Sequence, residues 1–181
     1  METMLENIVE IAKKNLVQDK YLSATFILVK GEEFVLPPTP IAMLGKVRAT
    51  HGYGDLNMEE SKTLDTILIG SLAKVYGADR VILIWDAAFR VADPNVPYDE
   101  TEAPLSYPKS MRTECIMASE VLLPSGQDTV ITIPYKGGEG EPVEFVQWEE
   151  KIAKAMKEGG KIQSRFTKLI LEGYNKAGAI L

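Results

Sequence analysis

The sequence predicts a single α+β domain over residues 1–181, in which helices pack on a mixed, largely antiparallel sheet of about five or six strands. Three observations lead to this fold class. The length suits one domain rather than two. β-rich segments follow one another near the carboxyl end with only turns between them, which predicts a strand meander. Helical patterns stand before and after these strands instead of alternating with each one, which favours an α+β fold over a doubly wound one.

The first elements are expected to be a helix and a hairpin. Apolar residues recur at three- and four-residue steps over roughly 3–18, which predicts an amphipathic helix. The β-rich segment 21–29 is followed by a turn at 30–33 and by 34–36, which indicates a hairpin. Because proline cannot donate to a strand ladder, the second strand is expected to end at the prolines of 37–40.

Two further helices are expected in the next 40 or so residues. Residues 41–48 favour a short one. A longer helix begins after Asn57, which forms a capping pair with Glu60, and ends at Gly77. Its expected buried face consists of apolar residues at helical spacing: Leu64, Ile67, Leu68, Leu72 and Val75.

The second half of the chain is expected to supply the centre of the sheet. Residues 80–85 are apolar without alternation, which indicates a central strand covered on both sides. The segments 111–123, 129–135 and 143–148 predict the meander. A helical pattern then covers about 149–177, and Gly159-Gly160 leaves open whether that helix is continuous.

Composition and charge narrow the range of functions. The net charge of −6 disfavours nucleic acid as a partner. With Cys115 and His51 as the only cysteine and histidine, no internal disulfide forms and a structural zinc site is not expected. The apolar run 81–85 is far shorter than the ~20 residues of a membrane span. We therefore expect a cytoplasmic protein with no membrane partner, metal or cofactor.

Several short motifs are better explained by structure than by chemistry. The glycine-rich segment 135–141 lies between two predicted strands and is expected to be a hairpin turn, not a phosphate loop. Ser125 lacks the first glycine of a nucleophile elbow. Cys115 alternates with core positions, which disfavours a reactive pair with His51. The acidic segment 93–102 resembles a calcium loop only in its first residues, and a solvated loop is favoured.

A long segment with little periodicity, 91–110, is the strongest indication of a site, because long irregular loops in compact domains are usually functional or disordered. It connects a buried strand to the meander, so polar residues at the two strand ends should lie close together. Such a cluster either positions a polar ligand or forms structural ion pairs between strands. The predicted ligand-binding residues are Asp86, Arg90, Arg112, Glu114, Tyr98 and Lys109.

A basic stripe on the last predicted helix is a second candidate surface. Lysines and arginine at three- and four-residue spacing fall on one side of a helical wheel, where they either contact an acidic partner or remain solvated. The predicted partner-binding residues are Lys154, Lys157, Lys161 and Arg165.

Three functions remain open from the sequence. The first is a non-catalytic interaction domain or one that self-associates into a homo-oligomer, since no catalytic constellation is visible. The second is a small-molecule enzyme or ligand-binding protein that uses the polar cluster. The third is nucleic-acid binding through the basic stripe, which the acidic net charge makes the least favoured. The sequence does not decide whether the protein is an enzyme.

Overall fold

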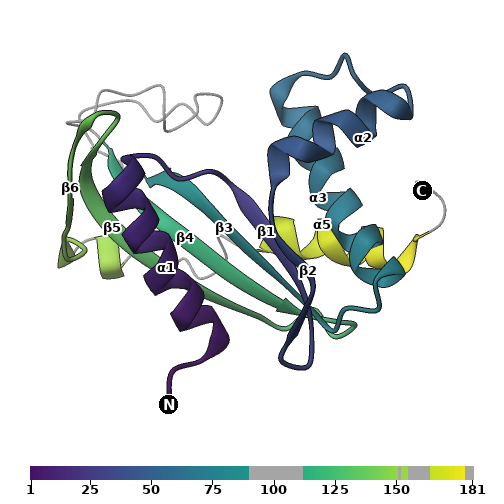
Figure 1. Ribbon diagram of the computed structural model, residues 1–181, viewed down its shortest axis with the longest axis horizontal. Coiled ribbons are helices and arrows are strands. Elements are labelled where there is room, and N and C mark those ends of the chain that lie inside the picture. Colours follow the sequence, from purple (N-terminus) through teal and green to yellow (C-terminus); the bar gives the residue numbers. More distant parts are fainter. Residues whose placement is uncertain (90–111, 151, 155–163, 178–181) are drawn as a thin grey trace.

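The computed structural model describes residues 1–89, 112–150, 152–154 and 164–177 and shows a six-stranded sheet between two layers of helices (Figure 1). The strand order is β2-β1-β3-β4-β5-β6, and every neighbouring pair is antiparallel. The predicted α+β class is therefore confirmed. The strands are β1 (Thr25–Lys30), β2 (Glu33–Pro40), β3 (Arg80–Phe89), β4 (Thr113–Leu122), β5 (Asp128–Gly138) and β6 (Glu141–Phe145).

The helices divide between the two faces of the sheet (Figure 1). Helix α1 packs on one face, while α3 and α5 pack together on the other and α2 lies beside α3. The bounds are α1 (Met4–Asp19), η1 (Ile41–Met43), α2 (Leu44–Thr50), α3 (Met58–Val75) and α5 (Ser164–Asn175). Among the described residues, no helix is long and apolar enough to cross a membrane.

Helix α1 forms where its apolar periodicity predicts it, and its first turn is capped. Thr3 Oγ1 accepts a hydrogen bond from the amide of Glu6, and the Glu6 carboxylate accepts one from the amide of Thr3, which makes a capping box. The apolar face of α1 packs on the alternate residues of the strands that point toward it. The buried helix residues are Leu5, Ile8, Val9, Ala12 and Leu16.

The opposite face of the sheet carries a helix pair that meets almost backbone to backbone. A Cβ atom placed on Gly70 of α3 would lie 2.0 Å from the carbonyl oxygen of Ile170, and one on Gly173 of α5 would lie 1.8 Å from that of Ile67. Neither position has room for a methyl group. The buried hydroxyl of Ser71 donates a hydrogen bond of 2.9 Å to the carbonyl of Gly173, which satisfies a backbone group at the crossing.

This helix contact corrects the predicted face of α3. Leu68 is buried as expected, but Val75 is 65% exposed. The buried face is instead built partly from small and polar residues, because α5 approaches too closely for large side chains. Asp65 of α3 is also buried, and its carboxylate forms an ion pair with Arg48 of α2 at 2.5 Å.

The prolines of 37–40 do not end the second strand, which runs to Pro40. The reason is its place in the sheet. β2 is an edge strand, so a proline whose missing amide would face outward breaks no ladder bond. The irregular β1–β2 register accommodates the other prolines. The opposite edge, β6, is short and carries Pro142 between glutamates. Both edges therefore have features that disfavour strand addition.

Several further predictions on individual elements agree with the structure. Strand β3 is central and buried on both faces over 81–84, although it extends beyond the predicted end to Phe89. Asn57 and Glu60 form the expected capping box of α3, and Gly77 follows its end with a φ of 69°. The predicted meander is β4-β5-β6. Gly159-Gly160 lies outside the described residues.

Candidate functional site

The structure brings together three of the predicted ligand-binding residues. Asp86 lies on β3 and Glu114 on the adjacent β4, while Arg112 immediately precedes β4. A guanidinium nitrogen of Arg112 lies 3.0 Å from the Glu114 carboxylate, and both side chains are mostly buried, with 9% and 12% exposure. The other three predicted residues, Arg90, Tyr98 and Lys109, lie outside the described residues.

Asp86 is held by a residue of β5. The hydroxyl of Tyr135 donates a hydrogen bond of 2.7 Å to its carboxylate. Tyr135 lies opposite Glu114 in the β4–β5 register, and its ring packs in the core under α1. Asp86, Glu114 and Tyr135 therefore form one polar cluster on the α1 side of the sheet, spread over three neighbouring strands.

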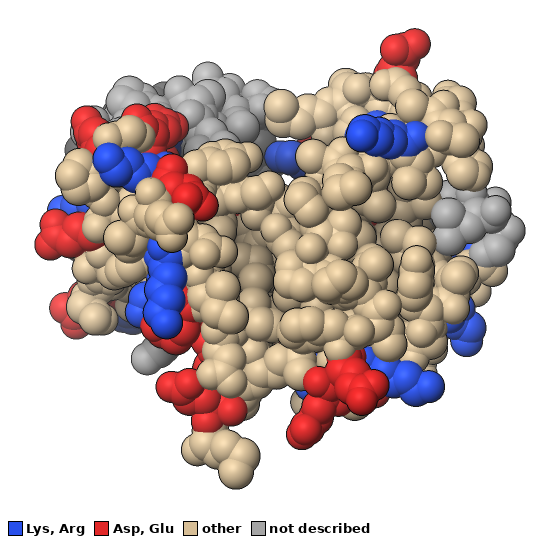
Figure 2. All heavy atoms as spheres, viewed as in Figure 1, with Lys and Arg blue, Asp and Glu red and all other residues tan. Residues whose placement is uncertain are grey.

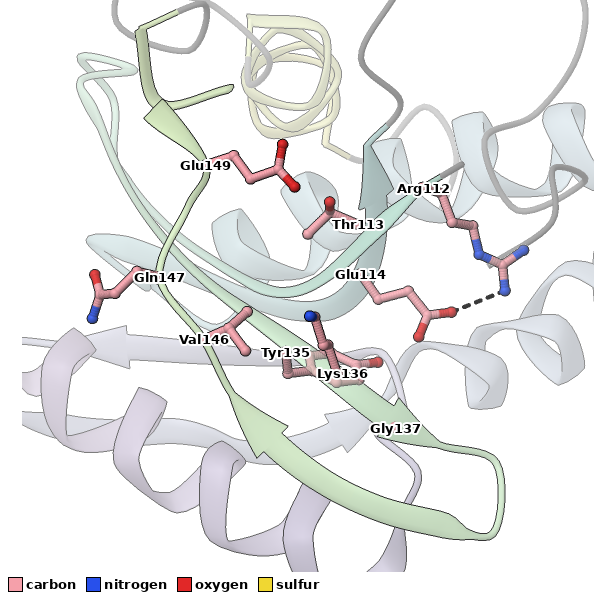
Figure 3. A pocket seen from close by; sticks show the side chains of 9 residues that line it. All are labelled: Arg112, Thr113, Glu114, Tyr135, Lys136, Gly137, Val146, Gln147 and Glu149. Atoms are coloured by element: carbon pink, nitrogen blue, oxygen red, sulfur yellow. Dashed lines mark hydrogen bonds and ion pairs between the residues drawn. The ribbon is translucent and has the colours of Figure 1, made fainter. Parts of the chain in front are cut away.

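A cavity of about 390 Å³ opens where β4 and β5 separate. The β4–β5 ladder ends at the pair Glu114–Tyr135, after which the two strands diverge. The segment that follows β6 closes the far side, as Figure 3 shows. The lining residues are Arg112, Thr113, Glu114, Tyr135, Lys136, Gly137, Val146, Gln147 and Glu149.

The side chains around this cavity form two groups (Figure 3). The ion pair of Arg112 and Glu114 lies on one side. On the other side Thr113 and Glu149 point toward each other, and Lys136 extends from β5 toward them. The cavity thus combines one ion pair with a second cation and a second carboxylate.

The backbone that carries Lys136 and Glu149 is held in place at both positions. Gly137 has a φ of +91°, and a Cβ atom there would lie 1.8 Å from the carbonyl oxygen of Pro142, so the bulge between β5 and β6 requires glycine. On the other wall the indole N–H of Trp148 donates to Thr132 Oγ1 at 3.1 Å. The Trp148 ring also meets Phe89 edge to face at 5.9 Å.

The surroundings of the polar cluster raise the pKa values of Asp86 and Tyr135. Burial raises the pKa of Asp86 above its ordinary value, and the nearby carboxylates of Glu114 and Glu139 raise it further, against the opposing effects of the Tyr135 hydroxyl and Arg112. Burial also raises the pKa of Tyr135, as does its hydrogen bond to Asp86. The phenol therefore stays a hydrogen-bond donor across the physiological pH range.

Three residues of this site are not recognisable as site residues from the sequence. Tyr135, Lys136 and Glu149 were assigned only to a strand end, a turn and the start of a helix. The available signal was the order of the meander, which places the end of β5 beside the start of β4. What the sequence does not show is the return of 146–149 across the end of the sheet.

The basic stripe is only partly within the described residues. Lys154 is exposed, while Lys157 and Lys161 lie outside the described residues. Arg165 forms an ion pair with Glu59 at 2.5 Å and a hydrogen bond with Thr63, both on α3, so its charge is directed to the neighbouring helix. On the face in Figure 2, lysine and arginine side chains are scattered among acidic ones and form no continuous basic surface.

The minor motifs have structural roles. Ser125 lies in the turn before β5, where its hydroxyl accepts a hydrogen bond from the amide of Gln127. Cys115 is fully buried, and burial raises the pKa of its thiol to about 12, so it is not a nucleophile. His51 is exposed at the end of α2 and contacts the carbonyl of Val47. The glycine-rich segment is the β5–β6 hairpin, as predicted.

Comparisons with protein-family models, with curated proteins and with solved structures found no match to this chain. Within the described ranges, no group of three or more His, Cys, Asp or Glu side chains is arranged to hold a metal ion.

Proposed function

We propose that this protein binds a small polar molecule in the cavity between β4 and β5. The observation that carries the proposal is the convergence of an almost fully buried ion pair, Arg112–Glu114, with a cavity at the splayed end of the sheet. Taking two charges out of water contributes little net stability, so the burial of this pair beside a cavity supports a role in a site.

The size and chemistry of the cavity support this proposal. Its volume of about 390 Å³ falls in the lower part of the range of ligand pockets, roughly 300–1,000 Å³. Charged groups of both signs, a hydroxyl at Thr113 and an amide at Gln147 line it beside the apolar Val146. This combination suits a small ligand held by a few directed polar contacts.

The alternatives have less support from the described residues. A self-associating domain stays a prediction, but pairing through the sheet edges is disfavoured by the prolines on β2 and β6. Nucleic-acid binding loses support because Arg165 is engaged with Glu59. A cytoplasmic location also stays a prediction, which the free thiol of Cys115 favours.

The test is a thermal-shift screen of a metabolite library, combined with native mass spectrometry of the gently purified protein. We expect a compound that stabilises the wild type and fails to stabilise Thr113→Phe, whose ring fills the cavity. The control is Thr129→Phe, the same change at an exposed position of β5. A compound that stabilises both variants equally would place its site elsewhere and refute the proposal.

A further inference from the structure

The arrangement of charges around the cavity points to a class of ligand, on the assumption that the cavity binds one as proposed above. The Arg112 and Glu114 side chains are bound to each other. Neither Lys136 nor Glu149 forms a side-chain hydrogen bond or an ion pair within the described residues. These two opposite charges border the same cavity, yet they do not reach each other.

Their separation is imposed by the backbone on each side. The backbone of Lys136 is set by the glycine-dependent bulge at Gly137, and that of Glu149 by the preceding Trp148, whose ring contacts Thr132 and Phe89. Both charged side chains are exposed. Opposite charges that are free to move approach each other, since that lowers their Coulomb energy. Two opposite charges that start from constrained backbone positions and border one cavity without pairing leave a gap that a molecule with complementary charges can bridge.

The total charge of the lining argues against a multiply charged anion. Two cations, Arg112 and Lys136, are balanced by two carboxylates, Glu114 and Glu149. A phosphate site has an excess of cations or backbone amides at a helix start. A balanced lining instead complements a ligand whose own charges cancel.

We infer that the ligand is a small zwitterion, such as an amino acid or a related aminocarboxylate. Its carboxylate meets the Lys136 ammonium group, its ammonium group meets the Glu149 carboxylate, and Thr113 between them offers a hydroxyl to either end. The length of the ligand is then set by the span between the two charged side chains.

A chemical-shift titration tests this inference with defined probes. The series is glycine, β-alanine, 4-aminobutanoate and 6-aminohexanoate, which differ in the distance between their charges. Butanoate and butylamine carry one charge each. We expect one member of the series to shift the amide resonances of 113, 136, 137 and 149. The singly charged compounds should bind at least about tenfold more weakly than that zwitterion, because each loses one charged hydrogen bond.

Variants then assign the two ends. Lys136→Gln and Glu149→Gln should each weaken the best zwitterion about tenfold. The exchange Lys136→Glu with Glu149→Lys should restore binding, with the ligand reversed. Glu144→Gln is the control, because Glu144 lies opposite Lys136 on β6 but does not line the cavity. Equal loss in that control would mean that general surface charge attracts the ligand, which would overturn the inference.

The two proposals fail in different ways. If no zwitterion shifts these resonances but a library compound binds in a way that Thr113→Phe abolishes, the site stands and the ligand class is wrong. If singly charged compounds bind as tightly as zwitterions, the ligand class is again wrong. If neither the series nor the library gives binding that depends on Thr113, both proposals are refuted.

Discussion

The α3–α5 crossing and the β4–β5 separation are opposite solutions to the packing of two neighbouring elements. At the crossing, Gly70 and Gly173 let the two backbones approach until no methyl group fits between them. At the separation, two paired strands diverge after Glu114–Tyr135 and leave a cavity of about 390 Å³. At the crossing, the Ser71 hydroxyl is hydrogen-bonded to the carbonyl of Gly173. At the separation, the charged side chains of Lys136 and Glu149 line the cavity. The two regions differ in what they offer: the crossing leaves no space between its backbones, whereas the separation leaves the cavity to which the proposed binding is assigned.

The strongest way to break this comparison is to add one methyl group at the closed region. Gly173→Ala places a Cβ atom 1.8 Å from the Ile67 carbonyl oxygen, which forces the helices apart and removes the Ser71 hydrogen bond. We expect a loss of about 3 kcal/mol in the free energy of unfolding, measured by chemical denaturation. Gly54→Ala, whose added Cβ makes only ordinary contact with Ala49, is the control. An unchanged denaturation midpoint for Gly173→Ala would contradict the close crossing.

The same substitution at the open region should have a smaller effect on stability and a larger one on binding. A Cβ atom on Gly137 would also lie 1.8 Å from a carbonyl oxygen, that of Pro142, but an edge hairpin adjusts more easily than two buried helices. We expect Gly137→Ala to lower the free energy of unfolding by about 2 kcal/mol and to abolish ligand binding in the titration. Gly140→Ala shares the positive φ without a contact within 4 Å, and it should keep binding.

A third substitution loosens the anchor of Glu149 without changing any charge. Trp148→Phe keeps a ring against Phe89 but removes the hydrogen bond to Thr132. We expect a loss of about 1 kcal/mol in stability and weaker zwitterion binding, because the backbone of Glu149 is then less constrained. Thr132→Val removes the same hydrogen bond from the other side and should reproduce both effects. Binding that survives both changes would show that the anchor is dispensable.

The smallest expected effect is a change in pH dependence at the polar cluster. Because the folded protein raises the pKa of Asp86, the folded state holds this proton more tightly than the unfolded state does. Its ionisation therefore removes stability as the pH rises from the ordinary carboxyl pKa through the higher folded value. Asp86→Asn keeps an acceptor for Tyr135 but does not ionise. The stability of this variant relative to wild type should increase over that window, and parallel pH profiles would count against the raised pKa.

The fold was predictable where local signals agree with the tertiary structure. The capping pair at Asn57 and Glu60 and the uninterrupted apolar run of β3 each specify an element by themselves. The end of β2 was predicted wrongly because a proline is tolerated or excluded according to strand position, which is set by the whole sheet. The face of α3 was predicted wrongly in part because Gly70 carries no hydrophobic signal, although it lies where α5 approaches too closely for a methyl group.

Some residues of the candidate site were predictable from the sequence, and others depend on the tertiary structure. Asp86, Arg112 and Glu114 flank one connection, so antiparallel pairing of β3 and β4 brings them together. Lys136 and Glu149 belong to the site only through the β4–β5 register and the course of the chain after β6. No spacing rule in the sequence contains that information.

The contact between the first helix and the last hairpin also bears on the order in which the protein forms. Lys20, which follows α1, makes two hydrogen bonds to the β5–β6 turn. Its carbonyl accepts one from the amide of Glu139, and its ammonium group donates one to the carbonyl of Gly140, which lies 120 residues further along the chain. Contacts this distant in sequence form slowly, and a chain leaving the ribosome makes its first residues well before the β5–β6 hairpin exists. During synthesis the apolar face of α1 therefore stays incompletely buried until strands β3 to β5 have been made. The nascent chain is most exposed to aggregation, and to chaperones, until about residue 140 has emerged.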